Sequence, residues 1–140
     1  MQISSKTHNA CLAVLELSVR YHQPQPVCLR EIADAHHLSS QFLVQILLQL
    51  KRSGLVESIR GAAGGYRLAL PPGQISLLDV VSAIDGEPRL PRCANTNTAA
   101  RTLNGVWLEL SAVERQRLSA TTFADLAASV QSETAAMYYI

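Results

Sequence analysis

The sequence has little that would place the protein in a membrane or outside the cell. No apolar run approaches the ~18 residues that a membrane span needs, and the opening residues MQISSKTHNACLAV lack the charged start and hydrophobic block of an export signal. Cysteine is scarce, and Cys11, Cys28 and Cys93 are an odd number and lie far apart, so we expect no disulfide framework. We expect a cytoplasmic protein without membrane contact, whose thiols are reduced or bind a metal.

An excess of one charge is also absent, because 12 Lys and Arg face 11 Asp and Glu. Net charge therefore favours no particular partner. The local distribution is uneven, since four of the five charged residues from Lys51 to Arg67 are positive. Three of the seven glycines fall in the same stretch, between the alternating segments LVESI and YRLAL. This pattern predicts a hairpin with a basic tip, which either grips a polyanion or is a solvated turn.

Helical periodicity accounts for most of the remaining chain. Residues 5–21 form one predicted helix, and residues 27–54 hold two more that are separated at HHLS, with Ser39 or Ser40 as the cap of the second and Gly54 as its stop. Further helices are predicted over 75–86, near 99–117, and from the capping-box pattern of Thr122 and Asp125. Two short helices across a tight turn, followed by a hairpin, indicate a winged helix-turn-helix. The expected fold is mostly α with a small β-hairpin wing and an added long helix.

This order predicts how the chain meets DNA. A wing lies along the DNA backbone or in the minor groove, where Arg60 can enter a narrow, strongly negative groove. Gly61, Gly64 and Gly65 let the backbone approach closely. The long helix carries an apolar stripe that a second subunit would cover. The residues of this stripe are Leu103, Val106, Trp107, Leu110 and Val113.

Three regions follow from these patterns. Residues 1–86 are the expected DNA-binding domain, and 99–140 the dimerisation helix with a C-terminal helix or tail. Between them, EPRLPRCANTNT over 87–98 is polar and without a period. A loop of this length usually has a function, and we interpret it as a sensor loop.

Four stretches together resemble the bacterial winged-helix regulators that include the iron–sulfur regulator IscR, the nitric-oxide sensor NsrR and the cysteine-metabolism regulator CymR. They are SSKTHNACLAVLELS, LREIADAHHLSSQFLVQILLQLKRSGLVES, RGAAGGYRLA and ISLLDVVSAIDGE. The resemblance spans nearly the whole chain. It implies a homodimer that binds double-stranded DNA at an inverted repeat, with the long helix as the dimer interface.

The resemblance also implies which residues read DNA. The family's base-contacting positions fall on Gln41, Val44 and Gln45, with Ser39 and Ser40 at the start of the recognition helix. Its minor-groove arginine falls on Arg60. A glutamine can pair with adenine through two hydrogen bonds. Members similar to IscR have an acidic residue where this chain has Val44, which offers only an apolar contact such as one with a thymine methyl, so we expect a different target sequence.

The sensor departs further from the family pattern. Cys93 matches the first of the three cysteines that hold an iron–sulfur cluster in these relatives, but Arg101 stands at the third and Asn104 at the histidine ligand. Other relatives use ligands from the first helix. Here His8 and Cys11 share one helix face and could meet Cys93 of the partner subunit, which would give a cluster with non-standard ligands.

Alternative functions remain at this point. One is a family member without cofactor, controlled by a partner protein or by a thiol switch at Cys93. Another is an enzyme, but the sequence has no nucleophile with base and acid, phosphate loop or paired carboxylates at a meaningful spacing. We therefore expect a DNA-binding regulator and no catalytic residues.

Overall fold

The protein is described by a computed structural model that covers residues 1–87, 89–90 and 97–138. Its elements follow the predicted order, and the mostly helical fold with one hairpin confirms the expected fold class. In chain order they are α1 (Ser5–Val19), α2 (Leu29–His36), α3 (Ser40–Arg52), β1 (Val56–Ile59), β2 (Gly65–Leu68), a short 3-10 helix η1 (Pro72–Gln74), α4 (Leu77–Asp85), α5 (Thr98–Ala120) and α6 (Phe123–Tyr138).

The core lies where α1, α3, α4 and α6 meet. The apolar stripe of α1 is buried against the stripe of α3, whose spacing of three and four residues puts its members on one helix face. Phe123 of α6 is fully buried in the same core. Burying each such side chain contributes about 1.5–3 kcal/mol. The buried members from α1 and α3 are Ala10, Ala13, Val14, Leu17, Leu43, Ile46, Leu47 and Leu50.

The short turn between α2 and α3 is closed by local hydrogen bonds. His37 ends α2 in the left-handed conformation, with φ of 54°. The Leu38 N–H then donates to the Ala33 carbonyl over 2.9 Å, which closes the helix end. Ser39 caps α3, because its side-chain oxygen accepts from the Phe42 N–H at 3.2 Å. The two helices of the predicted helix-turn-helix are thus held by local bonds.

The hairpin gains a third extended segment. β1 and β2 pair antiparallel with Val56 opposite Leu68 and Ile59 opposite Gly65. On the other edge of β2, Val27 and Tyr66 exchange two backbone hydrogen bonds of 2.9 and 2.7 Å. The strand predicted to continue to Leu70 ends at Leu68. The base of the hairpin is therefore anchored to the segment that leads into α2.

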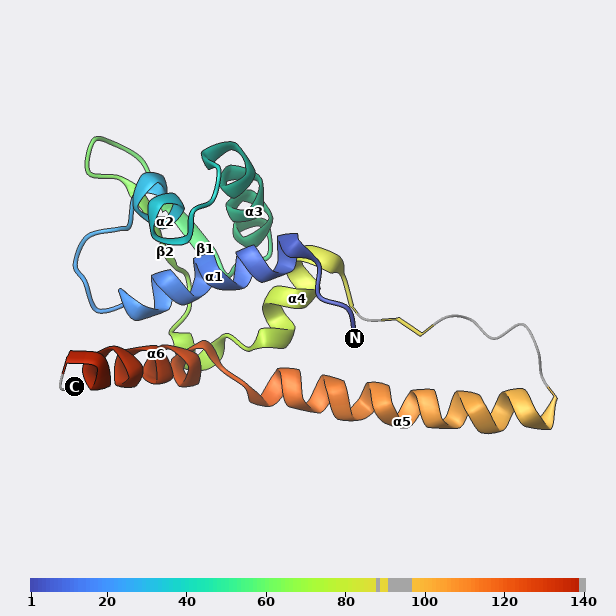
Figure 1. Cartoon of the computed structure of the whole chain (residues 1–140). Coiled ribbons are helices and arrows are strands. Elements are labelled where there is room, and N and C mark those ends of the chain that lie inside the picture. The colour runs from blue at the N-terminus through green and yellow to red at the C-terminus, as the bar shows by residue number, and fades with distance from the viewer. Residues whose placement is uncertain (88, 91–96, 139–140) are drawn as a thin grey trace.

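α5 and α6 lie on the side of α1 that is opposite to α3 and the hairpin (Figure 1). α6 begins with the predicted capping box, in which the Thr122 N–H donates to Asp125 and the Asp125 N–H donates to Thr122, each at 3.2 Å. It then packs on α1, whereas α5 contacts α4. None of the residues of α5, all of which the structure describes, is buried.

Candidate nucleic-acid interface

The outer face of α3 is a ridge of exposed side chains. Ser40, Gln41, Val44 and Gln45, predicted to contact DNA, are all exposed, while the opposite face of the helix is in the core. Leu48 extends the ridge by one turn and is also exposed. Sequence reasoning did not include Leu48, although its position four residues after Val44 and outside the buried stripe could have indicated it.

The tip of the hairpin presents Arg60 next to a tight turn. Gly61 has φ of 112°, which side chains rarely tolerate, and its carbonyl accepts from the Gly64 N–H at 3.0 Å. A Cβ on Gly65 would lie 2.4 Å from the Val27 carbonyl oxygen. The fold itself therefore requires glycine at positions 61 and 65. For this reason, the presence of these glycines does not by itself identify a DNA contact.

Some of the basic side chains predicted between Lys51 and Arg67 are engaged with other residues of the protein. Arg67 forms a cross-strand ion pair with Glu57, which neutralises it. The Lys51 ammonium donates to the Ser58 hydroxyl over 2.7 Å and joins the end of α3 to β1. The C-terminal end of α3 is therefore held next to the hairpin. Arg60 and Arg52 are exposed.

Charged side chains also join α2 to α1. Glu16 accepts from the Arg20 Nε at 2.8 Å, and its second oxygen lies 3.2 Å from the His36 Nε2. Arg20 also donates to Glu31, at 2.5 Å. Glu16, Arg20 and His36 are mostly buried. Because Glu31 and His36 lie near the two ends of α2, this cluster sets the position of the helix that precedes the recognition helix.

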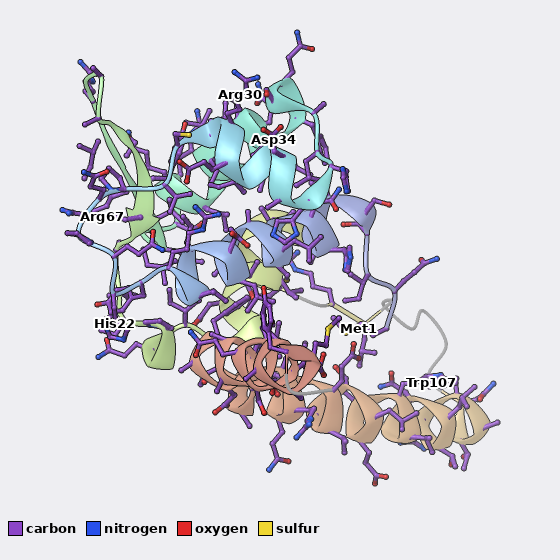
Figure 2. All side chains as sticks on the ribbon, turned by 60° about the vertical axis from the view of Figure 1, so that its left-hand side comes forward. Met1, His22, Arg30, Asp34, Arg67 and Trp107 are labelled. Atoms are coloured by element: carbon purple, nitrogen blue, oxygen red, sulfur yellow. The ribbon has the colours of Figure 1, made fainter. Side chains whose placement is uncertain are left out.

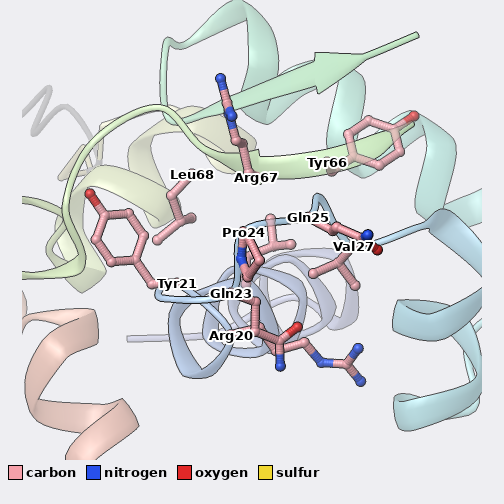
Figure 3. A pocket seen from close by; sticks show the side chains of 10 residues that line it. Arg20, Tyr21, Gln23, Pro24, Gln25, Val27, Tyr66, Arg67 and Leu68 are labelled. Atoms are coloured by element: carbon pink, nitrogen blue, oxygen red, sulfur yellow. The ribbon is translucent and has the colours of Figure 1, made fainter. Parts of the chain in front are cut away.

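A cavity of about 340 Å³ lies between the end of α1, the segment after it and β2 (Figure 3). Leu17, Val27 and Leu68 supply apolar walls. The two arginines that line it, Arg20 and Arg67, are both paired with glutamates. Among the described residues that line this cavity, both cations are thus already engaged in ion pairs.

The predicted metal ligands of α1 do not form a site with the described residues. His8 is exposed, whereas Cys11 packs against the core, and burial raises the pKa of its thiol to about 11. In the part of the chain that the structure describes, no three His, Cys, Asp or Glu side chains are grouped to hold a metal ion. Cys93 lies outside the described residues, so the third predicted ligand is not placed.

The five side chains predicted to form the dimer interface are spread along α5, and two of them, Trp107 and Leu110, also line a cavity shared with α4. All five are between 46% and 64% exposed. Figure 2 shows Trp107 on α5, far from Arg30 on α2. A row of large exposed apolar side chains along one helix is unusual on a monomeric protein.

Residues 3–129 match the Rrf2 family, described as iron-dependent transcriptional regulators. Bacillus subtilis CymR is 32% identical over the full length of both chains. Its structure, described as that of the global cysteine regulator, has a TM-score of 0.82 and covers 92% of this chain and 98% of its own.

Two IscR proteins are also similar. IscR of Aliivibrio salmonicida is 37% identical over 66% of this chain and 55% of its own. The T. potens IscR structure is 28% identical, with a TM-score of 0.77 over 93% of this chain and 88% of its own. Over the described residues, no helix has the length and apolar character for a membrane span. These relatives are transcriptional regulators, not enzymes, and the chain belongs to the Rrf2 family of DNA-binding transcriptional regulators.

Proposed function

We propose that the protein is a homodimeric regulator that binds an inverted repeat, with one α3 ridge and one hairpin wing from each subunit on each half-site. The observation that carries the dimer is the row of exposed apolar side chains on α5. Covering this row with the same row of a second subunit removes it from water, and an isologous interface of this kind has two-fold symmetry. A two-fold protein binds a two-fold DNA sequence.

The direct test is the size of the protein in solution. Leu110→Glu puts a charge into the centre of the row, where an unpaired charge would be buried in the dimer. Sedimentation equilibrium should give twice the chain mass for the wild type and the chain mass for the variant. Met137→Glu, at a side chain of α6 that is 78% exposed, is the matched control and should stay dimeric. A wild-type protein of single-chain mass, or a dimeric Leu110→Glu, would contradict the proposed interface.

Two signals are candidates. The family description favours an iron-linked signal, carried by a cluster whose non-standard ligands would be His8, Cys11 and Cys93. The burial of Cys11 instead favours a protein without cofactor, controlled by a thiol switch at Cys93 or by a partner protein. We propose the second, because Cys11 packs against the core whereas its predicted partner ligand His8 is exposed to solvent.

Purification without oxygen tests this choice. Iron and acid-labile sulfide are measured per subunit in the wild type, Cys93→Ala and His8→Ala. The proposal expects no stoichiometric iron or sulfide in any of the three. Iron and sulfide that are present in the wild type and lost in both variants would establish the cluster instead.

A further inference from the structure

The exposed ridge on α3 consists of Ser40, Gln41, Val44, Gln45 and Leu48, and two of these side chains are apolar. Val44 is 39% exposed and Leu48 is 40% exposed, and neither belongs to the buried stripe of α3. They lie four residues apart, on the same helix face. Gln41 and Gln45 are exposed beside them, and Lys51 follows on the same helix. The apolar pair is thus continuous with the polar residues that are proposed to face DNA.

We propose that Val44 and Leu48 read the C5-methyl groups of two thymines in each half-site. This inference rests on the proposed function. Apolar side chains cannot bond to phosphates, and the major-groove group that suits them is the thymine methyl. Four residues of α-helix rise by about 6 Å, close to two base steps of about 3.4 Å each. The ridge therefore spans two methyl groups that are roughly two steps apart.

Leu48 is the new element in this assignment. It makes the far end of the ridge part of base recognition, where the family resemblance had implied base contacts only from Gln41, Val44 and Gln45. A half-site should then combine adenines read by the glutamines with two thymines read by the apolar pair. Removing one buried methyl group from such a contact costs about fourfold in affinity.

The test uses DNA from which single methyl groups are removed. Wild-type protein first selects its preferred duplexes from a random pool, and each thymine of the selected half-site is then replaced by uracil, which lacks the methyl. Wild-type affinity should fall about fourfold at each of two positions. Val44→Ala should become insensitive to uracil at one of them, and Leu48→Ala at the other, while each keeps its sensitivity at the remaining position.

Val130→Ala is the control, since Val130 is 38% exposed on α6 and away from the ridge. It should keep both sensitivities, and circular dichroism should show all three variants folded. Wild-type affinity that ignores uracil at every thymine would overturn the inference, as would a Leu48→Ala protein with unchanged base preference, which is the outcome if the pair docks a partner protein instead. Failure to enrich any duplex would overturn the proposed function itself, and this inference with it.

Discussion

Replacing Gly65 by alanine should damage the wing through a backbone collision. The added Cβ would lie 2.4 Å from the Val27 carbonyl oxygen and 2.9 Å from the Cys28 nitrogen. Both atoms belong to the backbone, so no side-chain rotation relieves the contact. Ordinary contacts of this type begin near 3.4 Å. β2 and the segment at Val27 must therefore separate by about 1 Å.

This separation acts on the bonds that anchor the hairpin. Val27 and Tyr66, next to the substituted residue, exchange hydrogen bonds of 2.9 and 2.7 Å. Loss of two such bonds costs about 2 kcal/mol, and residual overpacking adds about 1 kcal/mol. We expect the free energy of unfolding to fall by about 3 kcal/mol. Because Arg60 is carried by the same hairpin, DNA affinity should also fall under conditions in which the variant is folded.

Urea unfolding followed by circular dichroism measures the first effect, at one fixed protein concentration because dimerisation also contributes to stability. Gly105→Ala is the matched control. A Cβ there has no atom within 4 Å, and Gly105 lies inside α5, so alanine should stabilise the helix by up to about 1 kcal/mol. A Gly65→Ala protein with the wild-type urea midpoint would refute the close packing of the wing against Val27.

Three further predictions concern charge and ionisation. Arg60→Ala should lower DNA affinity and reduce the slope of log affinity against log salt by about one per subunit, because a groove-bound arginine displaces counterions. The control is Arg67→Ala, which should change the slope less because the Arg67 side chain is paired with Glu57. Equal slopes for the two variants would argue against Arg60 as the groove contact. Glu16→Gln should lower the free energy of unfolding by about 1–2 kcal/mol, because Arg20 and His36 lose their shared charged partner. A thermal midpoint equal to that of the wild type would show that the charged cluster around Glu16 does not hold α2. Cys11 should react slowly with iodoacetamide at pH 8 in the folded protein, because burial raises the pKa of its thiol to about 11. The alkylation rate should rise about tenfold per pH unit towards pH 11. Mass spectrometry of the Cys11 peptide measures this rate, and fast labelling at pH 8 would mean that the thiol is not buried.

The sequence predicted the helices and the hairpin because their signals are local. Ser39 as a cap, the capping box at Thr122 and Asp125, and the apolar spacing of α3 act within a few residues. The order of these predicted elements then indicated a winged helix-turn-helix, and the family resemblance agreed with it. Local rules also gave most of the exposed face of α3, since the period of the helix separates the buried stripe from the ridge.

Other features depend on residues that are distant in sequence. Nothing near Val27 indicates that it pairs with Tyr66, and the pairing of Arg67 with Glu57 follows from strand register. The environment of Cys11 is likewise set by the packing of helices around α1. The spacing of His8 and Cys11 suggested a ligand pair, but spacing does not report the depth at which a thiol is buried.

Hydroxyl-radical footprinting of a selected duplex tests the central claim most directly. A dimer that places one α3 ridge and one wing on each half-site should protect two equal patches, related by two-fold symmetry and about 10 base pairs apart or a multiple of this spacing. The Arg60→Ala protein should lose the protection at the outer minor groove of both patches together. A single asymmetric patch, or protection that does not respond to Arg60, would contradict the account.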